Sequence, residues 1–346
     1  MTYKKNSLFL IALVILGGCV NKETSHDYTS VKIDVIFEDS FSIRAIEFLD
    51  SKPLAFAGSN GIYGSVNLAT KNVLTNQMKF HTSIPSFRAI AHTATDFFML
   101  SIENPALLYK TGDKGRMELV YKEEGDGVFY DAMKFMDNNR GIAVGDSQDG
   151  CLSIIITKDG GQTWKKLACE QLPEAEEGEG AFAASNTNIE IIGETIWIGT
   201  TSGSVYRTND LGDSWQKINT PILSAEPTQG IYSMDFYNES LGFAIGGDYT
   251  KPEALKANKI MTRDGGQTWS LIADGAAPSY KSCVQFIPNS GGQDLVALGF
   301  TGISYSGNGG HSWKTMSEEG FYTIRFLNDS IAYAAGKNRI AKLSFK

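Results

Sequence analysis

The sequence predicts an all-β fold, a seven-bladed β-propeller whose ring is closed by an N-terminal strand. Three observations support this prediction. A short turn motif recurs four times, a second unit with alternating apolar residues recurs seven times, and an alternating segment at residues 31–37 precedes the first of those units. Repeats of roughly 40–50 residues are typical of propeller blades, each of which is a sheet of four strands.

The turn motif occupies residues 157–164, 208–215, 262–269 and 306–313, and its tryptophans lie 51, 54 and 44 residues apart. Its acidic side chain is suited to accept backbone N–H bonds, its glycines supply a positive φ, and its hydroxyls bridge the ends of the turn. The motif resembles the Asp-box or BNR repeat, which joins the third and fourth strands of a propeller blade. We therefore assign a structural role to Asp159, Trp164, Asp210, Trp215, Asp264, Trp269, Asn308 and Trp313.

The seven alternating units begin at residues 43, 87, 130, 182, 231, 281 and 321, and we expect each to start the inner strand of one blade. The third member of every unit is small, as expected where inner strands converge near the axis and bulky side chains would collide. The seventh unit ends at Lys346 after only three plausible strands. We therefore expect residues 31–37 to pair with residues 339–345, which leaves no unpaired edge in the ring.

The N-terminus resembles a bacterial lipoprotein signal. Lys4 and Lys5 precede an apolar run that is too short to span a bilayer, and residues 16–19 read Leu-Gly-Gly-Cys, like a lipobox. We expect a signal peptide at residues 1–18, lipidation at Cys19, a tether over residues 19–29 and the propeller over residues 30–346. Such a protein would be lipid-anchored in the bacterial cell envelope, at the outer membrane or the periplasmic face. The alternative is a secretory signal whose cysteine is accidental.

Charge and composition argue against several classes of partner. The net charge of −8 disfavours binding to nucleic acid, because phosphate backbones repel an acidic protein. The four histidines are scattered without the spacing of metal ligands, so we expect neither a metal nor another cofactor. Calcium held by Asp146 and Asp149 remains an alternative.

The cysteines suggest one disulfide. If Gly160 lies at the centre of its hairpin, Cys151 is directly opposite Cys169, and an oxidising compartment would allow the two to form a bond. Cys283 occupies the small position of its unit, so we expect a free, buried thiol there.

Several further stretches carry a resemblance to a known family. They are the Arg-Ala-Ile starts at Arg44 and Arg88, and residues 104–110, 141–146 and 178–185. With these, almost the whole mature chain resembles the photosystem II stability/assembly factor family of seven-bladed propellers, which includes relatives in bacteria that do not photosynthesise. The resemblance implies a propeller that binds other proteins, and it does not imply a photosystem as the partner.

We expect the site on the rim opposite the Asp boxes, where loops enter the inner strands. The candidate residues are polar groups at the second position of each unit and in nearby loops: Arg44, Arg88, Asp131, Asp146, Glu179, Tyr232, Asp248 and Tyr322. Arg44 and Arg88 are suited to hold a carboxylate, because guanidinium groups bind oxyanions through paired hydrogen bonds. In the alternative, these arginines pair with Asp131 and Asp146 and bind no ligand.

The expected function is that of a membrane-anchored, protein-binding or assembly-factor-like module whose partner is another protein or a protein complex. The alternative is a sialidase-like or other BNR-repeat glycoside hydrolase, which would use Arg44, Arg88, Tyr232 or Tyr322, Glu179 and Asp131. Against catalysis, the Arg-Ile-Pro motif of sialidases is absent, since Ala89 follows Arg88, and no third arginine occupies an equivalent position. The sequence therefore favours binding over hydrolysis.

Overall fold

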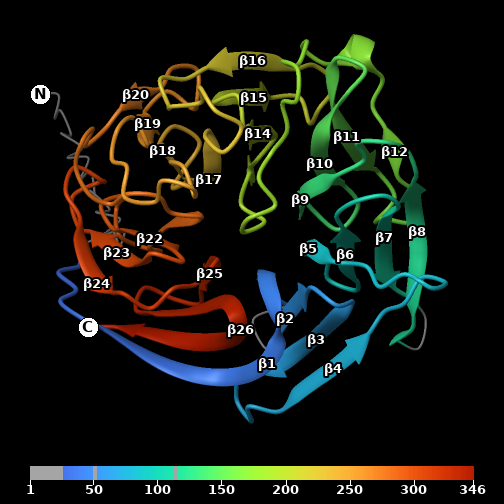
Figure 1. The fold of residues 1–346 in the computed structure, drawn as a ribbon, viewed down its shortest axis with the longest axis horizontal. Helices are drawn as coiled ribbons and strands as arrows, with labels where there is room; N and C mark the ends of the chain where they lie inside the picture. The colour runs from blue at the N-terminus through green and yellow to red at the C-terminus, as the bar shows by residue number, and fades with distance from the viewer. Residues whose placement is uncertain (1–25, 50–52, 113–114) are drawn as a thin grey trace, which may run out of the picture.

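The computed structural model describes residues 26–49, 53–112 and 115–346. Antiparallel sheets are arranged around a central axis in the manner of a propeller (Figure 1). Helical structure in these residues is limited to short turns such as η2 (Cys169–Gln171), and no described helix is long and apolar enough to cross a membrane. The expected signal peptide, Cys19 and most of the expected tether lie outside the described residues.

The prediction of seven blades is wrong, because the strands form six continuous sheets and the propeller therefore has six blades. Five sheets have four strands, and the sixth has six strands in the order β25-β26-β1-β2-β3-β4. The cause is β1 (Val31–Phe48), whose first part pairs with β26 (Ile331–Phe345) and whose second part pairs with β2 (Pro53–Gly58). The first and seventh units expected from the sequence thus belong to a single sheet.

The strands of each four-stranded blade follow one another in the chain, and the first of them lies nearest the axis (Figure 1). One blade contains β5 (Phe87–His92), β6 (Phe97–Ser101), β7 (Ala106–Thr111) and β8 (Met117–Glu123), and the next contains β9 (Tyr130–Phe135), β10 (Gly141–Gln148), β11 (Cys151–Thr157) and β12 (Lys165–Lys166). The third contains β13 (Ile189–Ile192), β14 (Thr195–Gly199), β15 (Ser204–Thr208) and β16 (Gln216–Asn219). The fourth contains β17 (Ile231–Phe236), β18 (Gly242–Gly246), β19 (Lys259–Thr262) and β20 (Ser270–Leu271). The fifth contains β21 (Cys283–Phe286), β22 (Leu295–Gly299), β23 (Gly302–Ser306) and β24 (Lys314–Ser317). The six-stranded sheet is completed by β3 (Ile62–Asn67), β4 (Val73–Gln77) and β25 (Thr323–Phe326).

The ends of the chain close the ring as expected. Val31 pairs with Phe345, Val35 with Ala341, and Glu38 with Arg339. The predicted pairing of residues 31–37 with residues 339–345 is therefore confirmed. Between Glu38 and Ser42 the register shifts, and there β1 passes from its β26 partner toward its β2 partner.

One of the expected inner strands does not exist. Residues 182–185 belong to a loop, and the inner strand of that blade, β13, begins only at Ile189. The loop over residues 181–188, which we call the axial loop, contacts the inner strands of several other blades through hydrogen bonds. The prediction of a strand at residues 182–185 was wrong because small residues fit a loop in the crowded centre of the ring as well as they fit an inner strand.

The Asp boxes form the turns expected from their side chains. In the first box, Asp159 accepts hydrogen bonds from the backbone N–H of Thr163 at 2.9 Å and from its hydroxyl at 2.6 Å, and the Thr157 hydroxyl accepts a bond from Gly161 N at 2.9 Å. In the fourth box, Asn308 replaces the acid and still accepts from the backbone N–H of Ser312 at 2.9 Å. The turn therefore depends on a side-chain oxygen at this position, which both residue types supply.

The hydrophobic core lies between neighbouring sheets. Trp164, which ends the first Asp box, packs edge-on against Phe135 of its own blade and Phe98 of the preceding blade, with ring centroids 5.7 and 6.4 Å apart. Equivalent clusters join the other neighbours, and a further cluster fills the space between the two halves of the six-stranded sheet. Large aromatic rings thus hold one sheet against the next.

Cys151 and Cys169 form a disulfide, with their Cα atoms 5.4 Å apart, and Cys283 is a buried free cysteine. The pairing of β11 with β12 is shifted by one residue from that of a hairpin centred on Gly160, since Ile156 pairs with Lys165. Cys169 also lies in the short turn η2 rather than in a strand. The turn brings its sulfur back toward the start of β11, which compensates for the offset.

Candidate functional site

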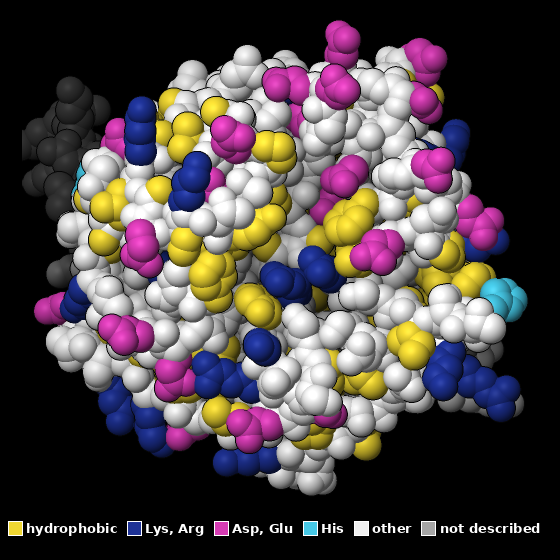
Figure 2. All heavy atoms as spheres, in the orientation of Figure 1, with side chains coloured by type: hydrophobic (Ala, Val, Ile, Leu, Met, Phe, Trp, Pro, Cys, Tyr) yellow, Lys and Arg dark blue, Asp and Glu magenta, His cyan; other side chains and the backbone are white. Residues whose placement is uncertain are grey.

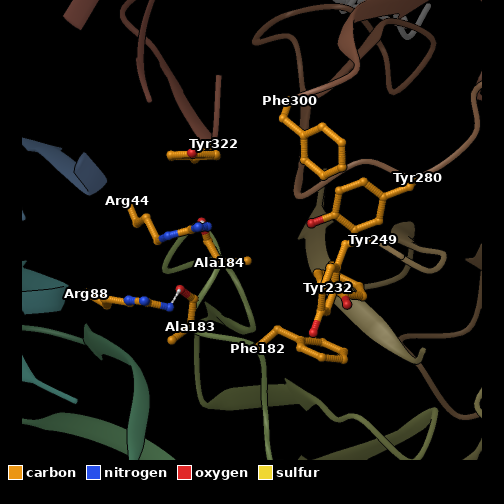
Figure 3. Close-up of a pocket in the computed structure, with 10 residues that line it drawn as sticks. All are labelled: Arg44, Arg88, Phe182, Ala183, Ala184, Tyr232, Tyr249, Tyr280, Phe300 and Tyr322. Atoms are coloured by element: carbon orange, nitrogen blue, oxygen red, sulfur yellow. Dashed lines mark hydrogen bonds between the residues drawn. The ribbon is translucent and has the colours of Figure 1, made fainter. Parts of the chain in front are cut away.

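A pocket opens at the axis on the rim where the chain enters the inner strands, which is the rim opposite the Asp boxes. Its volume is about 270 Å³, and we call it the axial pocket. Its lining residues are Arg44, Arg88, Phe182, Ala183, Ala184, Tyr232, Tyr249, Tyr280, Phe300 and Tyr322 (Figure 3). Of the eight candidate residues expected on this rim, the fold brings Arg44, Arg88, Tyr232 and Tyr322 to this cavity, whereas Asp131, Asp146, Glu179 and Asp248 do not line it.

Two arginines form one side of the axial pocket. The Arg44 guanidinium lies over the Tyr322 ring, 4.0 Å from its centroid, and donates to the carbonyl of Ala184 at 3.4 Å. Arg88 donates to the carbonyl of Ala183 at 3.4 Å (Figure 3). Burial, followed by the charge of Arg44, lowers the pKa of Arg88. Two like charges thus share a partly buried site, an arrangement that a bound anion would stabilise.

Aromatic rings form the other side of the axial pocket (Figure 3). Phe182 is stacked on Tyr232 with centroids 3.7 Å apart, and Tyr280 meets Tyr232 edge-on at 4.9 Å. At the rim, Tyr249 is 50% exposed and Phe300 is 45% exposed. Figure 2 shows this face, with blue Lys and Arg side chains at its centre and yellow hydrophobic side chains beside them. The pocket is therefore amphipathic, with cations facing aromatic surface.

The axial loop forms the floor of the pocket and fills the centre of the ring. Ser185 donates to the carbonyl of Ser282 at 2.7 Å, and its own carbonyl accepts from the Thr323 hydroxyl at 2.9 Å. Asn186 donates to the carbonyl of Ile90 at 2.8 Å and accepts from Met133 N at 2.9 Å. These bonds attach the loop to four different blades, so the pocket has a closed end rather than leading into an open channel.

Neither Arg44 nor Arg88 forms a close ion pair with an aspartate in the described residues, although the charges of Glu103 and Asp131 act on Arg88 from further away. Among the described residues, the arginines with a carboxylate within 4.0 Å are Arg140, Arg325 and Arg339. Asp131 is fully buried, and burial followed by Asp146 raises its pKa well above the ordinary value. Burial also raises the pKa of Asp146, to about 6. The two carboxyl groups thus form an acid pair beside the axial loop.

Glu179 and Asp146 line a second cavity of about 450 Å³ that shares Phe182 with the axial pocket. Glu179 accepts hydrogen bonds from Lys217 at 2.7 Å and from the Thr200 and Ser202 hydroxyls at 2.7 and 2.6 Å. Burial alone would raise the pKa of Glu179, but these bonds lower it. Its carboxylate is therefore engaged by hydrogen bonds within the fold, and it lies outside the axial pocket.

Asp248 does not line the axial pocket, although the next residue, Tyr249, does. The Asp248 side chain is buried and accepts from the backbone N–H of Thr250 at 2.9 Å and from the Thr250 hydroxyl at 2.6 Å. Despite burial, these bonds lower the pKa of Asp248 to about 2. The carboxylate thereby fixes the start of the loop that presents Tyr249 to the axial pocket.

The residues of the glycosidase alternative converge only in part, because Glu179 and Asp131 do not join Arg44, Arg88 and the tyrosines in the axial pocket. The Tyr232 hydroxyl donates to the Thr228 carbonyl at 2.7 Å, whereas Glu179 is held by Lys217 in the neighbouring cavity. Arg325, the remaining arginine considered, pairs with Glu47 at 3.3 Å and lines a different cavity. A tyrosine nucleophile beside a glutamate, with three arginines on one carboxylate, is therefore not assembled in the described residues.

The sequence prediction did not include Tyr280, Phe300 or the axial loop among the site residues. Tyr280 immediately precedes the Lys281 unit, and Phe300 follows the second strand of the same blade. Both positions map to the predicted rim, so rim position combined with aromatic character was the signal that could have identified them. For metals, the described residues contain no cluster of three or more His, Cys, Asp or Glu side chains suited to hold an ion.

Comparisons with known proteins agree with this fold. The model of the BNR/Asp-box repeat matches residues 155–166, and no curated protein is significantly similar to the chain in sequence. The solved structure of YCF48 bound to D1 peptide is 13% identical, with a TM-score of 0.65 over 93% of this chain and 98% of that chain. The chain is a β-propeller. The repeat and the likeness to YCF48 both support the propeller fold with Asp-box turns.

Two further structures show the same architecture. The RRP9 WD40 repeats are 9% identical, with a TM-score of 0.65 over 92% of this chain and 100% of that chain. The GH74 xyloglucanase from Xanthomonas campestris is 12% identical, with a TM-score of 0.61 over 90% of this chain and 53% of that chain. At such identities the likeness concerns the fold alone, and the function must be argued from the site.

Proposed function

We propose that this protein is a membrane-anchored binding module that holds a partner protein in its axial pocket. The observation that carries the proposal is the pair Arg44 and Arg88, which share the pocket and, among the described residues, have no carboxylate within 4.0 Å. Arginine charges in a partly buried site are costly unless an anion compensates them. A carboxylate of the partner is the anion that we assign to this pair.

A structural relative supports a protein as the partner. YCF48, which shares the propeller fold, has been solved bound to D1 peptide. The exposed aromatic rings of Tyr249 and Phe300 add to this, because aromatic and arginine side chains are enriched where proteins bind one another. The volume of the axial pocket, about 270 Å³, is slightly below the range of roughly 300–1,000 Å³ found for small-molecule sites. The pocket is thus suited to one anchoring residue of a larger ligand.

The membrane anchor is part of the proposal. His26, the first described residue, donates its backbone N–H to Asp294 at 2.7 Å, and Asp294 immediately precedes β22 on the Asp-box rim. A lipid on Cys19 would therefore tether the rim that lies opposite the axial pocket, and the pocket would stay accessible to a partner. Labelling with palmitate, compared between the native chain and Cys19→Ser, tests the anchor: label is expected only in the native chain, and equal label in both would refute it.

The binding role is tested by co-purification from cells that express the chain. Proteins that co-purify with the native chain should be lost from the Arg44→Ala/Arg88→Ala double variant. The matched control is Lys32→Ala/Lys71→Ala, which removes two charges at a separate surface cavity. Identical partner lists for the native chain and the double arginine variant would contradict the proposal.

A further inference from the structure

The axial pocket has a second recognition element that the arginines do not account for. Phe300 and Tyr249 expose about half of their surface at the rim, and Tyr280 lies between Phe300 and Tyr232, with centroid distances of 5.2 and 4.9 Å. This continuous aromatic wall faces the two arginines (Figure 3). Exposed aromatic surface beside positively charged side chains favours a ligand in which an apolar group lies next to an anionic group.

The shape of the pocket restricts how a polypeptide enters. Hydrogen bonds from Ser185 and Asn186 to neighbouring strands hold the axial loop across the bottom, so the chain of a ligand has no exit there. If an internal segment of a partner bound here, the chain would have to enter and leave through the same opening. A chain terminus has only to enter. A cavity of about 270 Å³ also holds little more than one large residue.

We infer that the axial pocket binds the free carboxyl-terminal residue of its partner, and that this residue carries an aromatic side chain. The α-carboxylate and the side chain leave the same Cα atom in different directions, so one residue can place its carboxylate between Arg44 and Arg88 and its ring against Tyr280 and Phe300. Paired guanidinium donors match the two oxygens of a carboxylate. Ring packing in offset or edge-on geometry supplies the second contact. This inference depends on the proposed binding role of the same pocket.

The test measures fluorescence anisotropy of labelled heptapeptides, Gly-Ser-Gly-Ser-Gly-Ala-Phe, titrated with the purified protein. The peptide with a free carboxylate is expected to bind, and its carboxamide is expected to bind about 10- to 100-fold more weakly because the charge-assisted hydrogen bonds are lost. Replacement of the last Phe by Ala should weaken binding about tenfold or more. Extension of the peptide by Gly-Ser beyond the Phe should have a similar effect.

A variant of the protein tests whether the aromatic side of the pocket binds the ring of the last peptide residue. Phe300→Ala is expected to weaken binding of the Phe-ended peptide about tenfold and to leave the Ala-ended peptide unchanged, because only the ring loses its contact. Leu74→Ala is the control, since Leu74 is 73% exposed on the outer strand β4. Loss of binding in this control would point to unfolding instead, and the circular dichroism spectra of both variants would reveal it.

The outcomes separate this inference from the proposed function. Equal affinity for the acid and the amide, or no saturable binding of any acid peptide, overturns the carboxyl-terminal inference. If co-purification of a partner still depends on Arg44 and Arg88 in that case, the binding role stands and the partner enters by another segment. If co-purification is also indifferent to the arginines, both proposals fail.

Discussion

The Arg44 guanidinium lies 4.0 Å from the centre of the Tyr322 ring, although the two residues stand near opposite ends of the propeller sequence. The contact exists because β1 and β26 pair within one sheet and bring the two ends of the chain together. The ring holds Arg44 at the edge of the axial pocket through a cation–π interaction. The strand pairing that closes the propeller therefore also brings two residues of the candidate site into contact.

Loss of the Tyr322 ring should weaken the site without breaking the fold. We expect Tyr322→Ala to reduce partner binding about 3- to 30-fold, since cation–π contacts contribute about 0.5–2 kcal/mol. Tyr322→Phe keeps the ring and should bind like the native protein. Surface plasmon resonance with the co-purified partner measures both variants. A Phe variant as weak as the Ala variant would show that the hydroxyl, not the ring, matters.

The acid pair beside the axial loop should make stability depend on pH. Because the folded state raises the pKa of Asp146 to about 6, it binds the proton more tightly than the unfolded chain does. This group's contribution to the free energy of unfolding should therefore be greatest below about pH 4 and should fall as pH rises to about 6. In urea unfolding between about pH 4 and pH 6, the free energy of unfolding of Asp146→Asn should fall by about 1–3 kcal/mol less than that of the native protein. The exposed Asp126→Asn variant serves as control, and an unchanged slope in Asp146→Asn would refute the assignment.

Removal of the disulfide should destabilise the protein. Cys151 and Cys169 are 18 residues apart, and a bond closing a loop of this size contributes about 3 kcal/mol. Urea unfolding of Cys151→Ala/Cys169→Ala should show a loss of about 2–4 kcal/mol. Reductant should lower the stability of the native protein and leave that of the double variant unchanged. A double variant as stable as the oxidised native protein would contradict this prediction.

The fourth Asp box indicates how an Asp substitution in the first should behave. Asn308 keeps the backbone bond to Ser312 that an aspartate makes elsewhere, so Asp159→Asn should preserve the turn. Asp159→Ala removes the bonds to Thr163 and should cost about 1–2 kcal/mol. Thermal unfolding compares the two variants. Equal losses for Asn and Ala would show that the negative charge, rather than the side-chain oxygen, stabilises the turn.

Local patterns predicted much of the architecture. The Asp boxes follow from short-range spacing, and the rim that carries Arg44 and Arg88 follows from their position at the start of inner strands. The pairing of residues 31–37 with residues 339–345 was predicted because the last unit has only three plausible strands and residues 31–37 alternate. Arg88 and Tyr232 could be placed on one rim from sequence because each is the second residue of its unit, at the start of an inner strand.

The remaining features depend on long-range packing. Whether two neighbouring blades form one sheet or two is decided by how β1 continues past Glu38, and no local pattern specifies that pairing. Residues 182–185 fit an inner strand by composition, yet hydrogen bonds to Ile90, Ser282 and Thr323 hold this region as a loop in the ring centre. The aromatic wall was missed for the same reason, since Tyr280 and Phe300 meet only after the loops fold.

The most direct test of the binding role places a photo-crosslinking amino acid at position 249, on the rim of the axial pocket, and at position 74, on β4 away from it, in cells that express the chain. We predict a defined protein adduct at position 249 that disappears in the Arg44→Ala/Arg88→Ala background, and none of that size at position 74. An adduct of equal strength at both positions, or one at position 249 that survives loss of both arginines, would contradict the account.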